Sequence, residues 1–79
     1  MTNVAAETFT AYVEQDPETG LYVGTVPGLP GAHTQAATLD ELRANLTEVI
    51  QLVLEAHAAR GESITVAPFI GIQQVTVSR

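Results

Sequence analysis

Nine carboxylates are the most numerous ionisable side chains in this chain, and clustered carboxylates hold the metal ions of many nucleases. Cleavage with two metals needs several of them around ions about 4 Å apart. The candidates near the expected first turn and on the expected helix are Glu14, Asp16, Glu18, Asp40, Glu41 and Glu48. A turn accounts for Asp16 and Glu18, and a helix N-terminus accounts for Asp40 and Glu41. Structural roles are therefore favoured, and a residual metal-dependent nuclease is the weaker hypothesis.

The histidines and serines do not form a catalytic pattern either. His33 and His57 are far apart, whereas metal ligands on a helix are typically four residues apart. Ser63 and Ser78 lack the strand-turn-helix setting of a serine nucleophile. Pro30 removes an amide that a phosphate-binding loop would need. The sequence predicts a protein that is not an enzyme and that has no cofactor or metal site.

The charge of the chain argues against direct binding to nucleic acid. The formal net charge is −6, with three arginines and no lysine. Affinity for a phosphate backbone comes from cations that displace counterions, and this chain has few. Acidity can serve solubility alone, or it can complement a basic partner. The carboxylates that we consider for such an acidic surface are Glu14, Asp16, Glu18, Glu48 and Glu55.

The size and composition limit how the chain is stabilised and where it works. A chain of 79 residues forms one small domain, and its core is modest. The chain has no cysteine and shows no signal peptide, so we expect a cytoplasmic protein without disulfides. The longest apolar run, Val49 to Leu54, is too short to span a membrane. Self-association, as a homodimer or homotetramer, is the expected supplement to the small core.

The N-terminal half predicts an antiparallel meander. Met1 to Ala6 reads as a flexible tail. Glu7 to Gln15 and Leu21 to Val26 read as strands joined by a turn with Pro17 and Gly20, which predicts a hairpin. Ala32 to Ala36 returns as a short third strand.

The loop before the third strand is the best candidate for a contact surface. Two prolines and two glycines in Pro27–Gly31 predict a rigid, shaped connection, which suits recognition because ordering it costs little entropy. A purely structural connection is an equal alternative. The residues that we predict to bind a partner are Glu14, Asp16, Leu29, Pro30, His33 and Gln35.

One amphipathic helix follows. Thr38 and Glu41 form a capping box at its start, and Arg60 and Gly61 fit its end. Between them, apolar residues recur every three or four positions on one stripe, which we expect to pack across the sheet: Leu39, Leu42, Leu46, Val49, Ile50, Val53 and Leu54.

A last strand is predicted at Phe69–Val77, with an imperfect alternation at Gln73-Gln74 that is typical of a bulge or an edge strand. We expect this strand to join the edge of the sheet or to pair with a neighbouring subunit. The predicted fold class is α+β: a three-stranded antiparallel meander covered by one helix, plus a C-terminal strand (βββαβ).

Three stretches together resemble the HicB-like antitoxin family: Gly20–Val23, Val26–Gln35 with its Pro-x-Leu-Pro-Gly loop and Thr-Gln pair, and the helix opening Thr38–Ile50. The resemblance covers Tyr12 to about Ser63 and weakens through the last strand. It implies a degraded RNase H-like domain without nuclease carboxylates. It also implies a partner, a small basic HicA-like toxin that cleaves RNA and is neutralised when the domain covers its active site.

Two departures from the family pattern matter. Ala36-Ala37 stands where relatives usually have glycine and an acidic residue, so the turn there is expected to be reshaped. Members of the family often carry a DNA-binding module after this domain, whereas we expect residues 1–79 to form a single domain without one. The alternative function is an orphan module that self-assembles and binds a regulatory or small ligand without a toxin.

Overall fold

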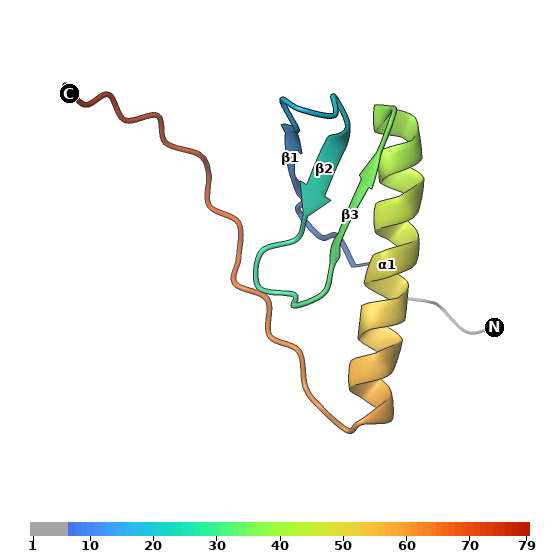
Figure 1. Ribbon diagram of the computed structural model, residues 1–79. Helices are drawn as coiled ribbons and strands as arrows, with labels where there is room; N and C mark the ends of the chain where they lie inside the picture. Colours follow the sequence, from blue (N-terminus) through green and yellow to red (C-terminus); the bar gives the residue numbers. More distant parts are fainter. Residues whose placement is uncertain (1–6) are drawn as a thin grey trace.

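The first four of the five predicted elements form, in the predicted order. The computed structural model describes residues 7–79, so the predicted tail at residues 1–6 lies outside the described residues. The strands are β1 (Tyr12–Gln15), β2 (Tyr22–Thr25) and β3 (His33–Ala36), and the helix is α1 (Leu39–Ala59) (Figure 1). The strands pair antiparallel in the order β1-β2-β3. The predicted α+β meander with one helix is confirmed.

β1 is shorter than its β-forming residues suggest. The paired stretch begins at Tyr12, which lies opposite Thr25, and the residues before it are extended without belonging to a strand. β2 ends at Thr25, and Pro27 follows two residues later. Proline cannot donate a ladder hydrogen bond, and it begins the loop. The partner strand therefore ends before it can pair with Glu7 to Thr10.

The loop before β3 is held by its own backbone hydrogen bonds. The N–H of Val26 donates to Ala32 O at 2.9 Å, and the N–H of Ala32 donates to Leu29 O at 3.0 Å. Gly28 and Gly31 adopt φ of 84° and 89°, a region that other residues rarely enter. The predicted rigid connection is formed by these bonds and these two glycines.

Both ends of α1 are capped as the sequence predicts. Thr38 Oγ1 accepts a hydrogen bond from Glu41 N at 3.1 Å, which satisfies one free amide of the first turn. At the other end, Gly61 N donates to Ala58 O at 3.0 Å and Glu62 N donates to His57 O at 2.9 Å. These two bonds form a Schellman motif, which ends the helix after Ala59.

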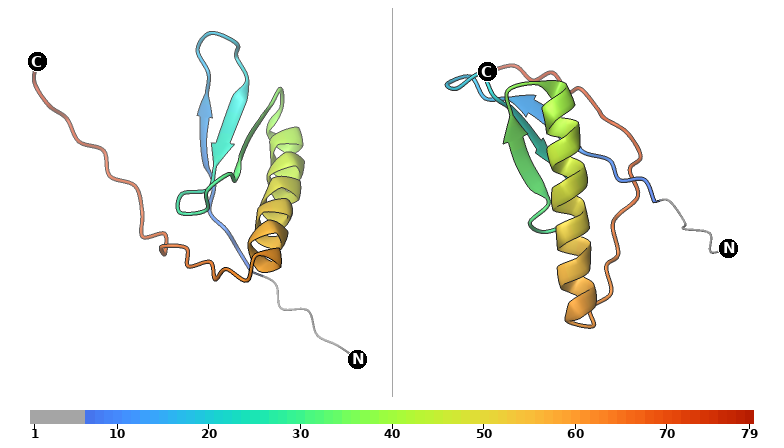
Figure 2. Two further views of the ribbon diagram at one scale, coloured as in Figure 1. Left: turned by 60° about the horizontal axis from the view of Figure 1, so that its bottom comes forward. Right: turned by 90° about the vertical axis from the view of Figure 1, so that its right-hand side faces the viewer.

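The core lies between α1 and one face of the sheet (Figure 2). One group of buried residues joins the start of the helix to β3, namely Ala36, Leu42 and Leu46. A second group joins the end of β2 to the loop, namely Val26, Leu29 and Ala32, with half-buried residues of α1 packed on it. The predicted apolar stripe packs across the sheet, except that Leu39 at its first position is 57% exposed.

Glu62 to Arg79 forms no strand, and the prediction of a strand at Phe69–Val77 that joins this chain's own sheet is wrong. Ile64 and Val66 pack against the core and the ring of Phe69 meets that of Tyr12, but the segment then leaves the body of the molecule (Figures 1 and 2). A strand needs a ladder partner as well as an extended backbone, and within the described residues this segment has none. Pairing with a neighbouring subunit stays a prediction, as does the relation to RNase H.

Candidate partner-binding site

The face of the sheet opposite α1 carries two cross-strand rows of side chains. Residues paired across an antiparallel sheet point to the same side, and successive residues alternate between the two sides. Gly24 meets Leu46 of α1, so its neighbours Val23 and Thr25 point away from the helix. The side chains of the two rows on this open face are Tyr12, Thr25, His33, Glu14, Val23 and Gln35.

Three of the six predicted contact residues meet on this open face. Glu14 and Gln35 both flank Val23, one on each neighbouring strand, and His33 lies two residues from Gln35 on β3. All three side chains are exposed. The face of the sheet away from α1 therefore carries a carboxylate, an imidazole and an amide, with Val23 between the carboxylate and the amide. Such polar groups are suited to hydrogen bonding with another surface.

Asp16 lies at the hairpin and shapes it. Its Oδ1 accepts a hydrogen bond from Glu18 N at 2.9 Å. This bond lowers the pKa of the Asp16 carboxyl below its usual 3.8, against an opposing effect of partial desolvation, and Thr19 adds hydrogen bonds that lower the pKa further. Asp16 is thus held ionised, next to the exposed carboxylates of Glu14 and Glu18. The hairpin is the acidic end of the sheet.

The loop contributes one exposed and one buried residue of the predicted set. Pro30 is exposed, and it precedes Gly31 and Ala32 on the way into β3. Leu29 has only 2% of its surface exposed and packs with Val26 and Ala32. Its side chain anchors the loop to the core and does not face a partner.

The five carboxylates considered for an acidic surface do not share one surface. Glu48 and Glu55 are seven residues apart on α1 and exposed. They lie about half a turn from Leu46 and Val53, which pack on the sheet, so they face away from it. Only Glu14, Asp16 and Glu18 lie together, at the hairpin.

Residues 9–76 match a family described as the HicB-like antitoxin of bacterial toxin-antitoxin systems. The chain belongs to this family. It is also 45% identical over 69 residues to a UPF0150 protein of Thermotoga maritima, a match that covers 87% of this chain and 88% of the relative. A UPF0150 protein of Archaeoglobus fulgidus is 45% identical and one of Synechocystis is 44% identical, each with 87% of this chain and 93% of the relative covered. No solved structure matches the chain at a significant level.

Membership of the HicB-like family indicates an antitoxin and therefore a toxin as partner. It also favours a role without catalysis. Within residues 7–79, no three histidine, aspartate or glutamate side chains come together in a way that would hold a metal ion. In the same part of the chain, no helix is both long and apolar enough to cross a membrane.

Asn45, near the start of α1, has a structural role. Asn45 Nδ2 donates to the backbone oxygen of Gln35 at 3.4 Å, which ties α1 to the outer edge of β3. Alanine at positions 36 and 37 causes no backbone strain, because no non-glycine residue in the described part has a positive φ. Ala36 is 7% exposed and packs against Leu42 and Leu46.

Sequence reasoning missed three residues of the site and its support. Tyr12 and Thr25 complete the row that begins with His33, and cross-strand register is needed to place them there. Gly24 was also missed, although a lone glycine inside a strand often marks a close approach of another element. That signal was present in the sequence and would have found it.

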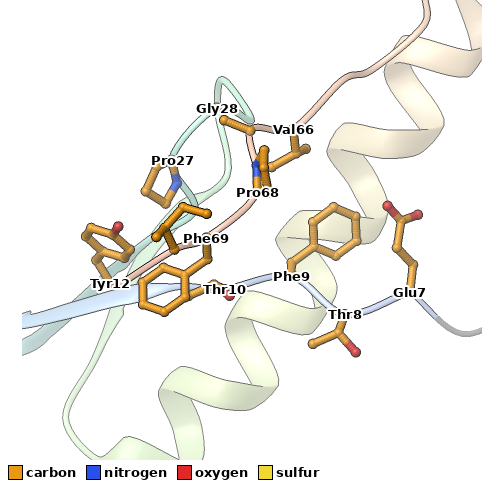
Figure 3. A pocket seen from close by; sticks show the side chains of 12 residues that line it. Glu7, Thr8, Phe9, Thr10, Tyr12, Pro27, Gly28, Val66, Pro68 and Phe69 are labelled. Carbon is orange, nitrogen blue, oxygen red and sulfur yellow. The ribbon is translucent and has the colours of Figure 1, made fainter. Parts of the chain in front are cut away.

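A groove borders the open face near Tyr12. It has a volume of about 420 Å³ and lies between the extended residues before β1 and the segment that returns after α1 (Figure 3). Phe9, Tyr12, Pro27 and Phe69 line it, and the rings of Tyr12 and Phe69 meet edge to face with centroids 6.0 Å apart. The rest of the lining includes the hydroxyl groups of Thr8 and Thr10 and one carboxylate, Glu7.

Proposed function

We propose that this chain neutralises a small basic HicA-like toxin by covering its RNA-cleaving site with the open sheet face and the acidic hairpin. The observation that carries the proposal is the grouping of Glu14, His33 and Gln35 on a face that no helix covers, beside Asp16 and Glu18. Family membership supports a toxin as the partner. A toxin that binds RNA must be cationic at its site, and an acidic surface complements that charge.

The rigidity of the surface supports the same proposal. The hairpin is closed by the bond from Glu18 N to Asp16, and the loop by the bonds between Val26, Leu29 and Ala32. A surface that is already ordered loses little entropy on binding. Inhibition by occupancy needs only such a surface, and no chemistry from the antitoxin.

The test uses the protein encoded by the neighbouring gene, provided that this protein is basic and has the size of a small domain. The two proteins are co-expressed and purified, and their affinity is measured by calorimetry alongside inhibition of RNA cleavage. We expect a stable complex in which RNA cleavage is lost. A neighbouring basic protein that cleaves RNA equally well with and without the chain would contradict the proposal and favour an orphan module.

The location of the site is tested with two pairs of substitutions of equal charge. Glu14→Gln with Glu18→Gln removes two charges from the hairpin, and Glu48→Gln with Glu55→Gln removes two from the far side of α1. All four residues are exposed. Because net charge changes equally, long-range attraction is matched, and only local contacts differ. We expect the hairpin pair to weaken affinity about tenfold more than the helix pair. Equal losses would place the contact elsewhere.

A further inference from the structure

The groove near Tyr12 has two walls, residues 7–12 and residues 66–70, and both are fixed to the same part of the core. Phe9 in the first wall and Val66 in the second pack against the buried group that joins the end of β2 to the loop. A Cβ atom at Gly28 would lie 3.6 Å from a backbone nitrogen of the second wall, so this wall also rests directly on the loop. The groove is therefore formed before anything binds in it (Figure 3).

Aromatic rings are concentrated in this groove. The chain has only four aromatic side chains, and three of them line it: Phe9, Tyr12 and Phe69. The rings of Tyr12 and Phe69 stand at 86° to each other and are 45% and 47% exposed, so they form an open corner. Figure 3 shows the Phe9 ring on the other side of Thr10 from the Phe69 ring. The faces of aromatic rings carry partial negative charge and attract cations.

The charge of the groove has the same sign as the ring faces. Within residues 7–79, Glu7 is the only charged side chain of the lining. Glu7 and Phe9 project from the same side of the first wall, toward the segment that carries Val66 and Pro68 (Figure 3). The chain as a whole has a formal net charge of −6, which adds to the negative potential of the groove. An anion would be repelled there, and a cation is attracted both by the rings and by the carboxylate.

The shape and size of the groove indicate the class of cation. A bare ammonium is strongly hydrated and would lose water at the apolar rings, and a guanidinium is flat and stacks on one ring face. A methylated ammonium is rounded and has few hydrogen bonds to lose, so it fits a corner between two rings that stand at 86°. The groove volume of about 420 Å³ lies in the range of small-molecule pockets, about 300–1,000 Å³. A whole small molecule therefore has room in it.

We propose that this groove binds a free small organic cation that carries a methylated ammonium group. The faces of Phe9, Tyr12 and Phe69 surround the methyl groups, and the Glu7 carboxylate balances the positive charge. The hydroxyl group of Thr10, which also lines the groove, offers a hydrogen bond to a polar substituent of the ligand. This inference does not depend on the toxin and goes beyond the proposed function.

The ligand class is tested by titrating the ¹⁵N-labelled full chain with choline and with its neutral analogue, in which carbon replaces nitrogen. Sodium chloride keeps the ionic strength equal in both titrations. We expect choline to shift the amide signals of residues 7–12 and 66–70 in a saturable way, with a dissociation constant on the order of a millimolar. The neutral analogue has the same shape and should bind at least about fivefold more weakly. Equal binding of the two, or choline shifts that lie away from the groove, would overturn the proposal.

The roles of the ring and of the carboxylate are tested separately with the same two ligands. Phe69→Leu keeps an apolar side chain but removes a ring face, and Phe69 lies outside the helix and strands. We expect it to weaken choline at least about fivefold and to change the neutral analogue less than about twofold. Glu7→Gln should weaken choline more than Glu55→Gln, which removes the same charge from the exposed side of α1. If Phe69→Leu weakened both ligands equally, or the two glutamine variants bound choline equally, the proposed cation site would be wrong.

Discussion

A Cβ atom at Gly24 would lie 2.9 Å from Cδ1 of Leu46, with Cδ2 and Cγ of the same leucine at 3.2 and 3.3 Å. The missing side chain of this glycine is what allows α1 to rest directly on β2. Since Leu46 is only 9% exposed, it cannot simply turn outward to make room. The layer spacing of the domain depends on this one pair of residues.

Gly24→Ala is expected to destabilise the domain by about 1–3 kcal/mol, the usual cost of overpacking. Replacing glycine also stiffens the unfolded chain and returns about 0.4–1 kcal/mol, so the net loss lies toward the lower end. Urea unfolding measures it. Leu46→Ala alone should cost about 2–5 kcal/mol, and clearly less when combined with Gly24→Ala. Additive losses in this double-mutant cycle would contradict the close contact.

Substitutions in the loop and at the start of β3 should affect either the stability of the domain or its binding to the toxin, depending on whether the residue is buried. Leu29→Ala removes a side chain that is 2% exposed and should cost about 2–5 kcal/mol of unfolding free energy. Pro30→Ala with His33→Ala changes exposed residues and should alter thermal stability little while weakening toxin binding. Calorimetry on both variants checks this. Unchanged affinity in the double variant would move the contact surface away from the loop.

The Asp16 carboxyl predicts a specific acid dependence of stability. Its pKa is lowered in the folded protein, so its contribution is present above the unfolded value near 3.8 and is lost as pH falls through the folded pKa. Asp16→Asn should therefore unfold more readily than the wild type at neutral pH, with the difference closing at strongly acidic pH. Urea unfolding at several pH values tests it. Glu55→Gln removes an exposed carboxylate from α1 and serves as the matched control.

Replacement by alanine is expected to affect stability differently at the two helix threonines, Thr38 and Thr47. Thr38→Ala removes the oxygen that accepts from Glu41 N and should cost about 1 kcal/mol, whereas Thr38→Ser should retain most of it. Thr47 Oγ1 donates to Arg43 O at 2.9 Å in the middle of α1, where this bond stabilises little. Thr47→Ala should thus be neutral or slightly stabilising, because alanine favours helix. Thermal unfolding compares the two, and equal losses would argue against Thr38 as the N-cap.

The site was only partly predictable from the sequence. The loop and the acidic hairpin stood out because proline, glycine and aspartate act locally. Which side chains share the open face is different, because cross-strand register decides it: His33 joins Tyr12 and Thr25 through pairing between strands. Leu29 looked like any loop residue, and only packing revealed that its side chain is directed into the core.

The sequence alone determined the order of the three strands and the helix, and the ends of the helix, because caps, turns and apolar periodicity act over a few residues: Thr38 and Gly61 bound α1 as their types predict. Only the tertiary structure decided what lies against what. It placed Gly24 under Leu46 and left Phe69–Val77 without a partner strand, since a β-strand is defined by a neighbour that its own residues do not specify.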